Sequence, residues 1–138
     1  MRSPILSPVI FCCWVRIALK GIIKPNYMCK TIVLSSGEHT AISHCPCCKV
    51  YYVWHNNLVL SFSGQEFLSF REIIENASFT ETALPFPDKK ERILLRSPNE
   101  DISFAFTSEE LEEFRSMLNE AIYMQEVYTL MGTAPGTR

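Results

Sequence analysis

Six cysteines are the residues of this 138-residue chain best suited to chemistry, and three of them fall in the segment Cys45-Pro46-Cys47-Cys48. Cys45 and Cys48 form a Cys-x-x-Cys pair. Two thiolates at this spacing can bind one tetrahedral zinc ion, so such a pair is half of a typical zinc site. A complete site requires two further ligands, which other parts of the chain must supply.

The residues before this pair predict a β-hairpin that would bring a further ligand close. Lys30–Ser35 has the composition of a strand, Ser36-Gly37 is a turn dipeptide, and Thr40–Ser43 predicts a second, shorter strand. Residues that face each other directly across two antiparallel strands have Cβ atoms about 4.5–5.5 Å apart. The length of the turn therefore decides which residues meet.

Cys29 is the ligand that this hairpin predicts. A two-residue turn places Cys29 opposite His44, and a three-residue turn places it opposite Cys45. We expect a structural zinc site with Cys29, Cys45, Cys48 and His44 as ligands, and with Cys47 as the alternative fourth ligand.

Two other interpretations of these cysteines remain open. They could be reduced thiols that pack as small hydrophobic side chains. The Cys-x-x-Cys pair could also be a redox couple or a disulfide. Redox pairs of the thioredoxin type open a helix that lowers the pKa of the thiol, whereas this pair lies between two predicted strands. A disulfide requires an oxidising compartment, and we expect a cytoplasmic protein.

Two stretches, Leu58–Ala77 and Ile102–Ala121, repeat one pattern at an offset of 44 positions (58 to 102). Each begins with alternating apolar residues, which predict a strand, and continues with apolar residues at helical spacing. Five positions are identical in the two stretches: Phe62 and Phe106, Glu66 and Glu110, Phe70 and Phe114, Arg71 and Arg115, Ala77 and Ala121. The offset predicts an internal repeat.

Each predicted helix begins with a capping box. Ser63 is followed three positions later by Glu66, and Thr107 by Glu110. In this motif the hydroxyl accepts a hydrogen bond from the backbone of the third helical residue, whose carboxylate accepts one from the backbone of the cap. The second helix continues past its copy and is expected to end near Gly132.

Each of the two repeated strands is preceded by a second predicted strand with which it can form a hairpin. The two stretches are therefore parts of two β-β-α units at residues 49–77 and 92–121. Val50–Trp54 predicts a strand, and His55-Asn56-Asn57 predicts its turn, where a histidine is usually solvated. Residues 78–91 contain prolines and predict a linker. We therefore expect an α+β domain: an N-terminal β-hairpin that bears the cysteine pair, then two β-β-α repeats. The strands would form a mainly antiparallel sheet with both helices on one face.

The charge distribution argues against nucleic acid as the partner. The formal net charge is −2, but residues 1–27 hold four basic side chains and no acidic one. The rest of the chain has nine basic against fifteen acidic residues. Nonspecific binding to nucleic acid depends on Lys and Arg, which neutralise phosphates. A basic patch at Lys30 and Lys49, beside the cysteine pair, would instead favour a nucleic-acid-binding zinc ribbon.

The ends of the chain differ from the predicted domain, which spans residues 28–131. Residues 1–27 predict an N-terminal extension that does not pack well, with Met28 as the true start; a signal or anchor is the alternative. Their apolar runs are broken by Arg16, Lys20 and Lys24, so they are shorter than the ~20 residues that a membrane span needs. Residues 132–138 predict a flexible tail.

The chain resembles a family of small, uncharacterised bacterial proteins. These proteins open with Met-Cys, carry one Cys-x-x-Cys, and continue through a strand, an Asn-containing turn and a strand into a Phe-x-x-Phe helix. The resemblance covers residues from Met28 to Leu130, and its cysteines match Cys29, Cys45 and Cys48. It implies a layout and no activity.

The sequence lacks the motifs of common enzymes, including a phosphate-binding glycine loop, His-Glu-x-x-His and Gly-x-Ser-x-Gly. We therefore expect a non-enzymatic protein that binds zinc structurally and presents a surface to another protein, with no membrane or nucleic-acid partner. A thiol-dependent redox protein is the alternative, and a nucleic-acid-binding zinc ribbon is a third, less favoured one.

Overall fold

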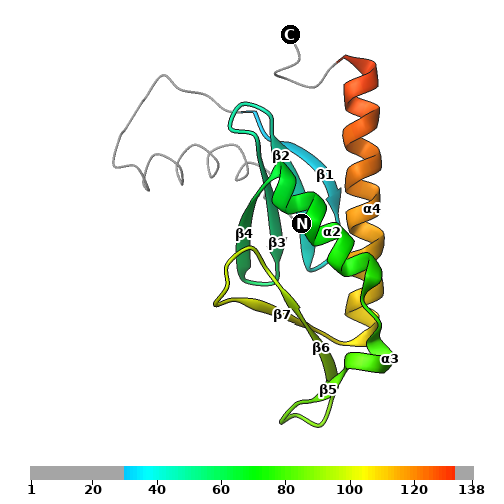
Figure 1. The fold of residues 1–138 in the computed structure, drawn as a ribbon. Coiled ribbons are helices and arrows are strands. Elements are labelled where there is room, and N and C mark those ends of the chain that lie inside the picture. Colours follow the sequence, from blue (N-terminus) through cyan, green and yellow to red (C-terminus); the bar gives the residue numbers. More distant parts are fainter. Residues whose placement is uncertain (1–29, 133–138) are drawn as a thin grey trace.

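The computed structural model describes residues 30–132, which form an α+β fold of antiparallel strands and helices (Figure 1). The predicted fold class is confirmed. In chain order the elements are β1 (Ile32–Ser36), β2 (Thr40–Cys45), β3 (Val50–His55), β4 (Leu58–Ser63), α2 (Gly64–Asn76), α3 (Phe79–Thr82), β5 (Leu84–Pro85), β6 (Glu91–Arg96), β7 (Ser103–Phe106) and α4 (Ser108–Met131). The predictions for residues 1–27 and for most of the tail fall outside the described residues.

The first four strands form one antiparallel sheet in the order β1-β2-β3-β4. Side chains alternate between the two faces of a strand, so Ile42 and Val53, which face each other, lie on the same side of this sheet. That side is the core face. Helix α4 packs on β1 and β2, and helix α2 packs on β3 and β4, so both helices cover the core face (Figure 1).

The register of β1 with β2 differs from the prediction. Ser36 pairs with Ala41, and the register shifts between Val33 and Ser35, so Ile32 is the residue opposite His44. The expectation that Cys29 lies opposite His44 is therefore wrong, and Cys29 itself lies outside the described residues. The reason is local: the turn is longer than a two- or three-residue hairpin loop and is closed by the Gly37 N–H, which donates to the Thr40 carbonyl at 2.7 Å.

The remaining strands form a second antiparallel sheet, β5-β6-β7, instead of extending the first one. The segment expected to be a linker contains α3 and β5, and β5 pairs with β6 through Leu84 opposite Arg92 and Pro85 opposite Glu91. Because β5 occupies one edge of β6 and β7 occupies the other, β6 has no edge left for pairing with β4. The two sheets meet instead through side chains packed under the helices.

Both predicted capping boxes are present. The Glu66 N–H donates to Ser63 Oγ at 3.1 Å, and the Ser63 N–H donates to Glu66 Oε1 at 2.9 Å. In α4 the Glu110 N–H donates to Thr107 Oγ1 at 3.3 Å, and the Thr107 N–H donates to Glu110 Oε1 at 2.9 Å. Helix α4 ends as expected at Gly132, whose φ of 68° is the left-handed conformation that glycine adopts without strain.

The core is built largely from residues at equivalent positions of the two predicted repeats. Four such pairs are almost fully buried: Phe62 and Phe106, Phe67 and Leu111, Phe70 and Phe114, Ile74 and Leu118. Burial of each side chain is worth about 1.5–3 kcal/mol, so this cluster is a main source of stability. The two units share a layout of hairpin, strand and capped helix, while their origin by duplication stays a prediction.

No helix within residues 30–132 is long and apolar enough to cross a membrane.

Candidate functional site

The cysteine pair lies at the turn that joins β2 to β3, and hydrogen bonds within the turn hold its backbone. Cys45 ends β2, and residues 46–49 form the turn. The Cys48 N–H donates to Cys45 Sγ at 3.4 Å, and the Lys49 N–H donates to the Cys45 carbonyl at 2.7 Å. Lys49 adopts φ 59°, a left-handed conformation that lets the chain reverse into β3. The turn therefore brings the backbone of Cys48 to the sulfur of Cys45.

The three cysteines of this turn differ in exposure. Cys45 is fully buried and forms a small apolar cluster with Val50 and Tyr52, against which Cys48 packs. Cys48 is half-buried and Cys47 is exposed. Cys45 is thus the inner thiol of the turn, and the other two lie nearer to solvent.

His44 points to the opposite side of the sheet from Cys45. Its ring stacks on Tyr51 with centroids 4.2 Å apart, and Tyr51 stacks on Phe67 of α2 at 4.3 Å. These aromatic rings belong to the core face, whereas Cys45 packs with Val50 and Tyr52 on the other face. Burial lowers the pKa of His44, and its buried Nδ1 has no hydrogen-bond partner among the described residues.

Of the four residues predicted to bind zinc, the structure brings Cys45 and Cys48 together. His44 lies on the other face, and Cys29 falls outside the described residues. Within residues 30–132 no group of three or more His, Cys, Asp or Glu side chains is arranged to hold a metal ion. A complete site at this turn would therefore need a ligand from outside residues 30–132 or a rearrangement of the side chains within them.

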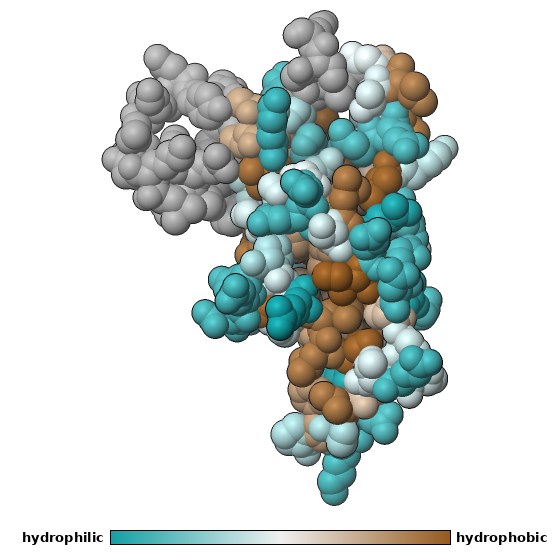
Figure 2. Space-filling view, in the orientation of Figure 1, coloured by the Kyte–Doolittle hydropathy of each residue, from teal (hydrophilic) through white to brown (hydrophobic). Residues whose placement is uncertain are grey.

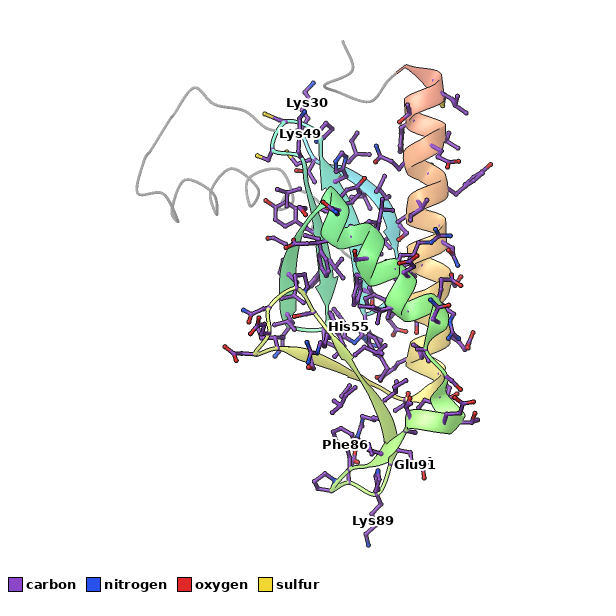
Figure 3. All side chains as sticks on the ribbon, viewed as in Figure 1. Lys30, Lys49, His55, Phe86, Lys89 and Glu91 are labelled. Carbon is purple, nitrogen blue, oxygen red and sulfur yellow. The ribbon has the colours of Figure 1, made fainter. Side chains whose placement is uncertain are left out.

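Lys30 and Lys49 lie at the same end of the four-stranded sheet as the cysteine turn (Figure 3). Lys30 stands just before β1, and Lys49 is the last residue of the turn. Two cations are few for nonspecific binding to a phosphate backbone, because proteins that depend on this interaction make many phosphate contacts.

His55 occupies a second polar site, which sequence reasoning assigned to a solvated turn. Its Nδ1 lies 2.8 Å from the hydroxyl oxygen of Thr40, a buried residue of β2. Its ring is in edge contact with Phe106, Phe114 and Phe104, with centroids 5.4, 5.5 and 6.1 Å away.

The alternation of β3 was the signal that could have located His55. Tyr51 and Val53 are core-facing, and His55 is the next residue in the same alternation. The strand continues through His55 instead of ending at Trp54, so the histidine faces the core.

Comparison with protein-family models gives a match over residues 28–131 to the family described as "Family of unknown function (DUF6686)". The chain belongs to DUF6686. Every strand and helix from β1 to α4 of this DUF6686 member lies within the matched range. The resemblance to an uncharacterised family is therefore confirmed. No curated protein and no solved structure matched the chain.

Proposed function

We propose that this DUF6686 domain is a small non-enzymatic module that binds zinc structurally at its cysteine turn and presents a surface to another protein. The observation that best supports the zinc site is the hydrogen bond from the Cys48 N–H to Cys45 Sγ at 3.4 Å. A donor directed at sulfur favours the thiolate, which is the form of cysteine that binds metal.

The donor set fits zinc, a borderline-soft ion that closed structural sites bind through Cys₄ or Cys₃His shells. Cys45 and Cys48 supply two sulfurs from one turn, and Cys29 is proposed as the third. As the fourth ligand we propose Cys47 in preference to His44, because the His44 ring stacks on Tyr51 on the opposite face of the sheet. Cys47 would have to turn toward Cys45 and Cys48, since the three side chains are not arranged to hold a metal ion.

A shell of four protein ligands leaves no position for water or substrate, so such an ion would stabilise the fold without catalysing a reaction. The ion would join Cys29, ahead of β1, to the β2–β3 turn. Because the unfolded chain has no preformed site, binding of zinc would add to the free energy of unfolding.

The proposed protein partner is supported by exposed apolar side chains on the four-stranded sheet. Trp54 and Val59 face each other across β3 and β4, and they are 48% and 40% exposed. A half-exposed tryptophan is typical of the anchors that carry most of the binding energy in protein interfaces.

The test of the zinc site is metal analysis of the full chain, purified without chelator or affinity metal. We expect about one zinc per chain. Replacement of both Cys45 and Cys48 by serine should abolish binding, whereas a matched Cys12→Ser Cys13→Ser variant should retain it. Cys47→Ser should weaken binding more than His44→Gln. Substoichiometric zinc that is the same in the Cys45→Ser Cys48→Ser variant would contradict the proposal.

A thiol-dependent redox function is the second candidate, and the exposure of Cys47 beside Cys48 favours it. The position of the pair weighs against a redox function, because it lies between strands and no helix of residues 30–132 begins there to stabilise a thiolate. The protein purified for metal analysis also distinguishes the zinc site from the redox function. Protein without zinc that forms a reversible disulfide between Cys45 and Cys48 would support the redox candidate.

A further inference from the structure

His55 lies at the junction of the two sheets. It ends β3 at the edge of the β3–β4 turn (Figure 3). Its ring contacts Phe104 and Phe106 of β7 and Phe114 of α4. The residues that surround it are thus supplied by the second hairpin and the long helix, while its Nδ1 is held by Thr40 of β2.

The neighbouring turn strengthens this junction on the side of the four-stranded sheet. The Asn56 N–H donates to the His39 carbonyl at 2.8 Å, so the β3–β4 turn is tied to the β1–β2 loop. The contact with the second hairpin is different in kind, because around His55 it consists of aromatic rings. A positive charge on the histidine would therefore affect the aromatic contact with the β6–β7 hairpin more than the backbone hydrogen bond between Asn56 and His39.

Three charged or titratable groups act on His55 from the elements packed against it. Glu110 and Glu113 approach from α4, and His39 approaches from the β1–β2 loop. Burial lowers the pKa of His55 and is the largest influence; the two carboxylates raise the pKa, and His39 lowers it. Glu110 also accepts the hydrogen bond from the Thr107 N–H, which fixes its carboxylate at the helix cap.

We propose that His55 is a pH-sensitive latch that holds the β6–β7 hairpin and the first turns of α4 against the four-stranded sheet. With a neutral imidazole the ring packs among the three phenylalanines. Protonation places a cation among them, and opening of the junction returns that cation to water. The hydrogen bond with Thr40 survives protonation, because Nδ1–H can donate to the hydroxyl oxygen.

The direction of the pH effect follows from the lowered pKa. The open junction takes up a proton near the ordinary histidine pKa of about 6.5, and the closed junction takes it up at lower pH. The latch is therefore fully effective above pH ~6.5 and weakens as the pH falls below that value. Each unit between the two pKa values corresponds to about a tenfold change in the opening equilibrium.

The test is amide hydrogen exchange of the full chain between pH 7.5 and 5, expressed as protection factors that remove the intrinsic pH dependence. We expect protection in β6 and β7 to fall by about tenfold for each unit by which the His55 pKa is lowered, while the β2–β3 ladder keeps its protection. In His55→Gln, which cannot titrate, the pH dependence should be lost. The comparison variant His39→Gln removes a group that lowers the His55 pKa, so it should keep the pH dependence with a smaller fall in protection.

Two outcomes would overturn the proposal. One is a fall in β6–β7 protection that persists in His55→Gln. The other is an NMR titration of the wild-type chain in which His55 has a midpoint at or above that of a free histidine. The second measurement needs no variant, so it decides the matter even if His55→Gln does not fold.

Discussion

Arg115 of α4 caps the C-terminal end of α2 through the carbonyl of Ala77. Its Nη2 donates to the Ala77 carbonyl at 2.6 Å, and its Nε donates to the Ile74 carbonyl at 3.2 Å. The last turn of α2 contains no basic residue, and Ala77 is its C-cap. A cation from another helix therefore binds the Ala77 carbonyl and adds a second hydrogen bond to the Ile74 carbonyl, which also accepts from the Ala77 N–H at 3.3 Å. Positive charge at this helix end is also favoured by the helix dipole.

The first prediction is that Arg115→Ala lowers the free energy of unfolding by about 1.5–3 kcal/mol, the range for hydrogen bonds to a charged group. Arg115→Lys should recover only part of this, because an ammonium cannot reproduce the planar fork that reaches two carbonyls. Urea unfolding followed by circular dichroism gives both values.

The matched control is Arg71, which occupies the equivalent position of the first repeat. Its guanidinium binds the exposed side chain of Asn119 at 3.1 and 3.0 Å instead of a helix end. Arg71→Ala should cost less than ~1 kcal/mol, because water competes for the contacts that a charged side chain makes at an exposed site. Equal losses at Arg71 and Arg115 would show that the helix cap is not the reason.

The second prediction concerns the two capping boxes. Ser63→Ala and Thr107→Ala should each lower the free energy of unfolding by about 1 kcal/mol, because each leaves a helix N–H without its acceptor. Thr107→Ser should be nearly neutral, since it keeps the hydroxyl. Ser108→Ala, one position further on and outside the box, is the control; a loss there as large as at Thr107 would contradict the capping role.

The third prediction compares Phe106 of the second unit with Phe86, which precedes that unit. Phe106 is fully buried among aromatic rings, so Phe106→Ala should cost about 3–5 kcal/mol. Phe86 lies on the β5–β6 hairpin, outside the core cluster, where the Arg92 guanidinium lies 5.4 Å from its ring centroid. Phe86→Ala should cost less than ~2 kcal/mol, the magnitude of such a cation–π contact when it is desolvated. Thermal and urea unfolding of both variants check the difference, and similar losses would mean that the hairpin belongs to the cooperative core.

The hairpin tip supplies a fourth prediction. Asp88 accepts hydrogen bonds from Arg92 Nη1 at 2.9 Å and from the Lys90 N–H at 3.1 Å, and these lower its pKa below 3.8. Any stabilisation from this carboxylate is therefore present above pH ~3.8 and is lost as the pH falls through the lowered pKa.

An NMR titration of Asp88 measures this effect directly. Arg92→Gln should move its midpoint upward, because Arg92 is the largest cause of the shift. The control is Lys89→Gln. The hydrogen bonds to the Asp88 carboxylate come from Arg92 and Lys90, so loss of the Lys89 charge should leave most of the pKa shift in place. A midpoint unchanged by Arg92→Gln would contradict the assignment.

Elements whose signals lie within a few residues of each other could be predicted from the sequence. The alternation of Leu58, Leu60 and Phe62, followed by the box of Ser63 and Glu66, was sufficient to predict a strand that runs into a capped helix. The same signals predicted β7 and α4 and the end of α4 at Gly132. These features depend on hydrogen bonds and side-chain spacing within one or two turns of chain, so no distant residue is needed to specify them.

The way in which those elements pack together depends on contacts between distant parts of the chain. The register that places Ile32 opposite His44 depends on a turn and a bulge, and the two-sheet arrangement depends on the pairing of β5 with β6. The aromatic surroundings of His55 come from β7 and α4, about fifty to sixty residues further along the chain. Such contacts are selected by the burial of whole faces against each other, and local sequence carries no record of which faces will meet.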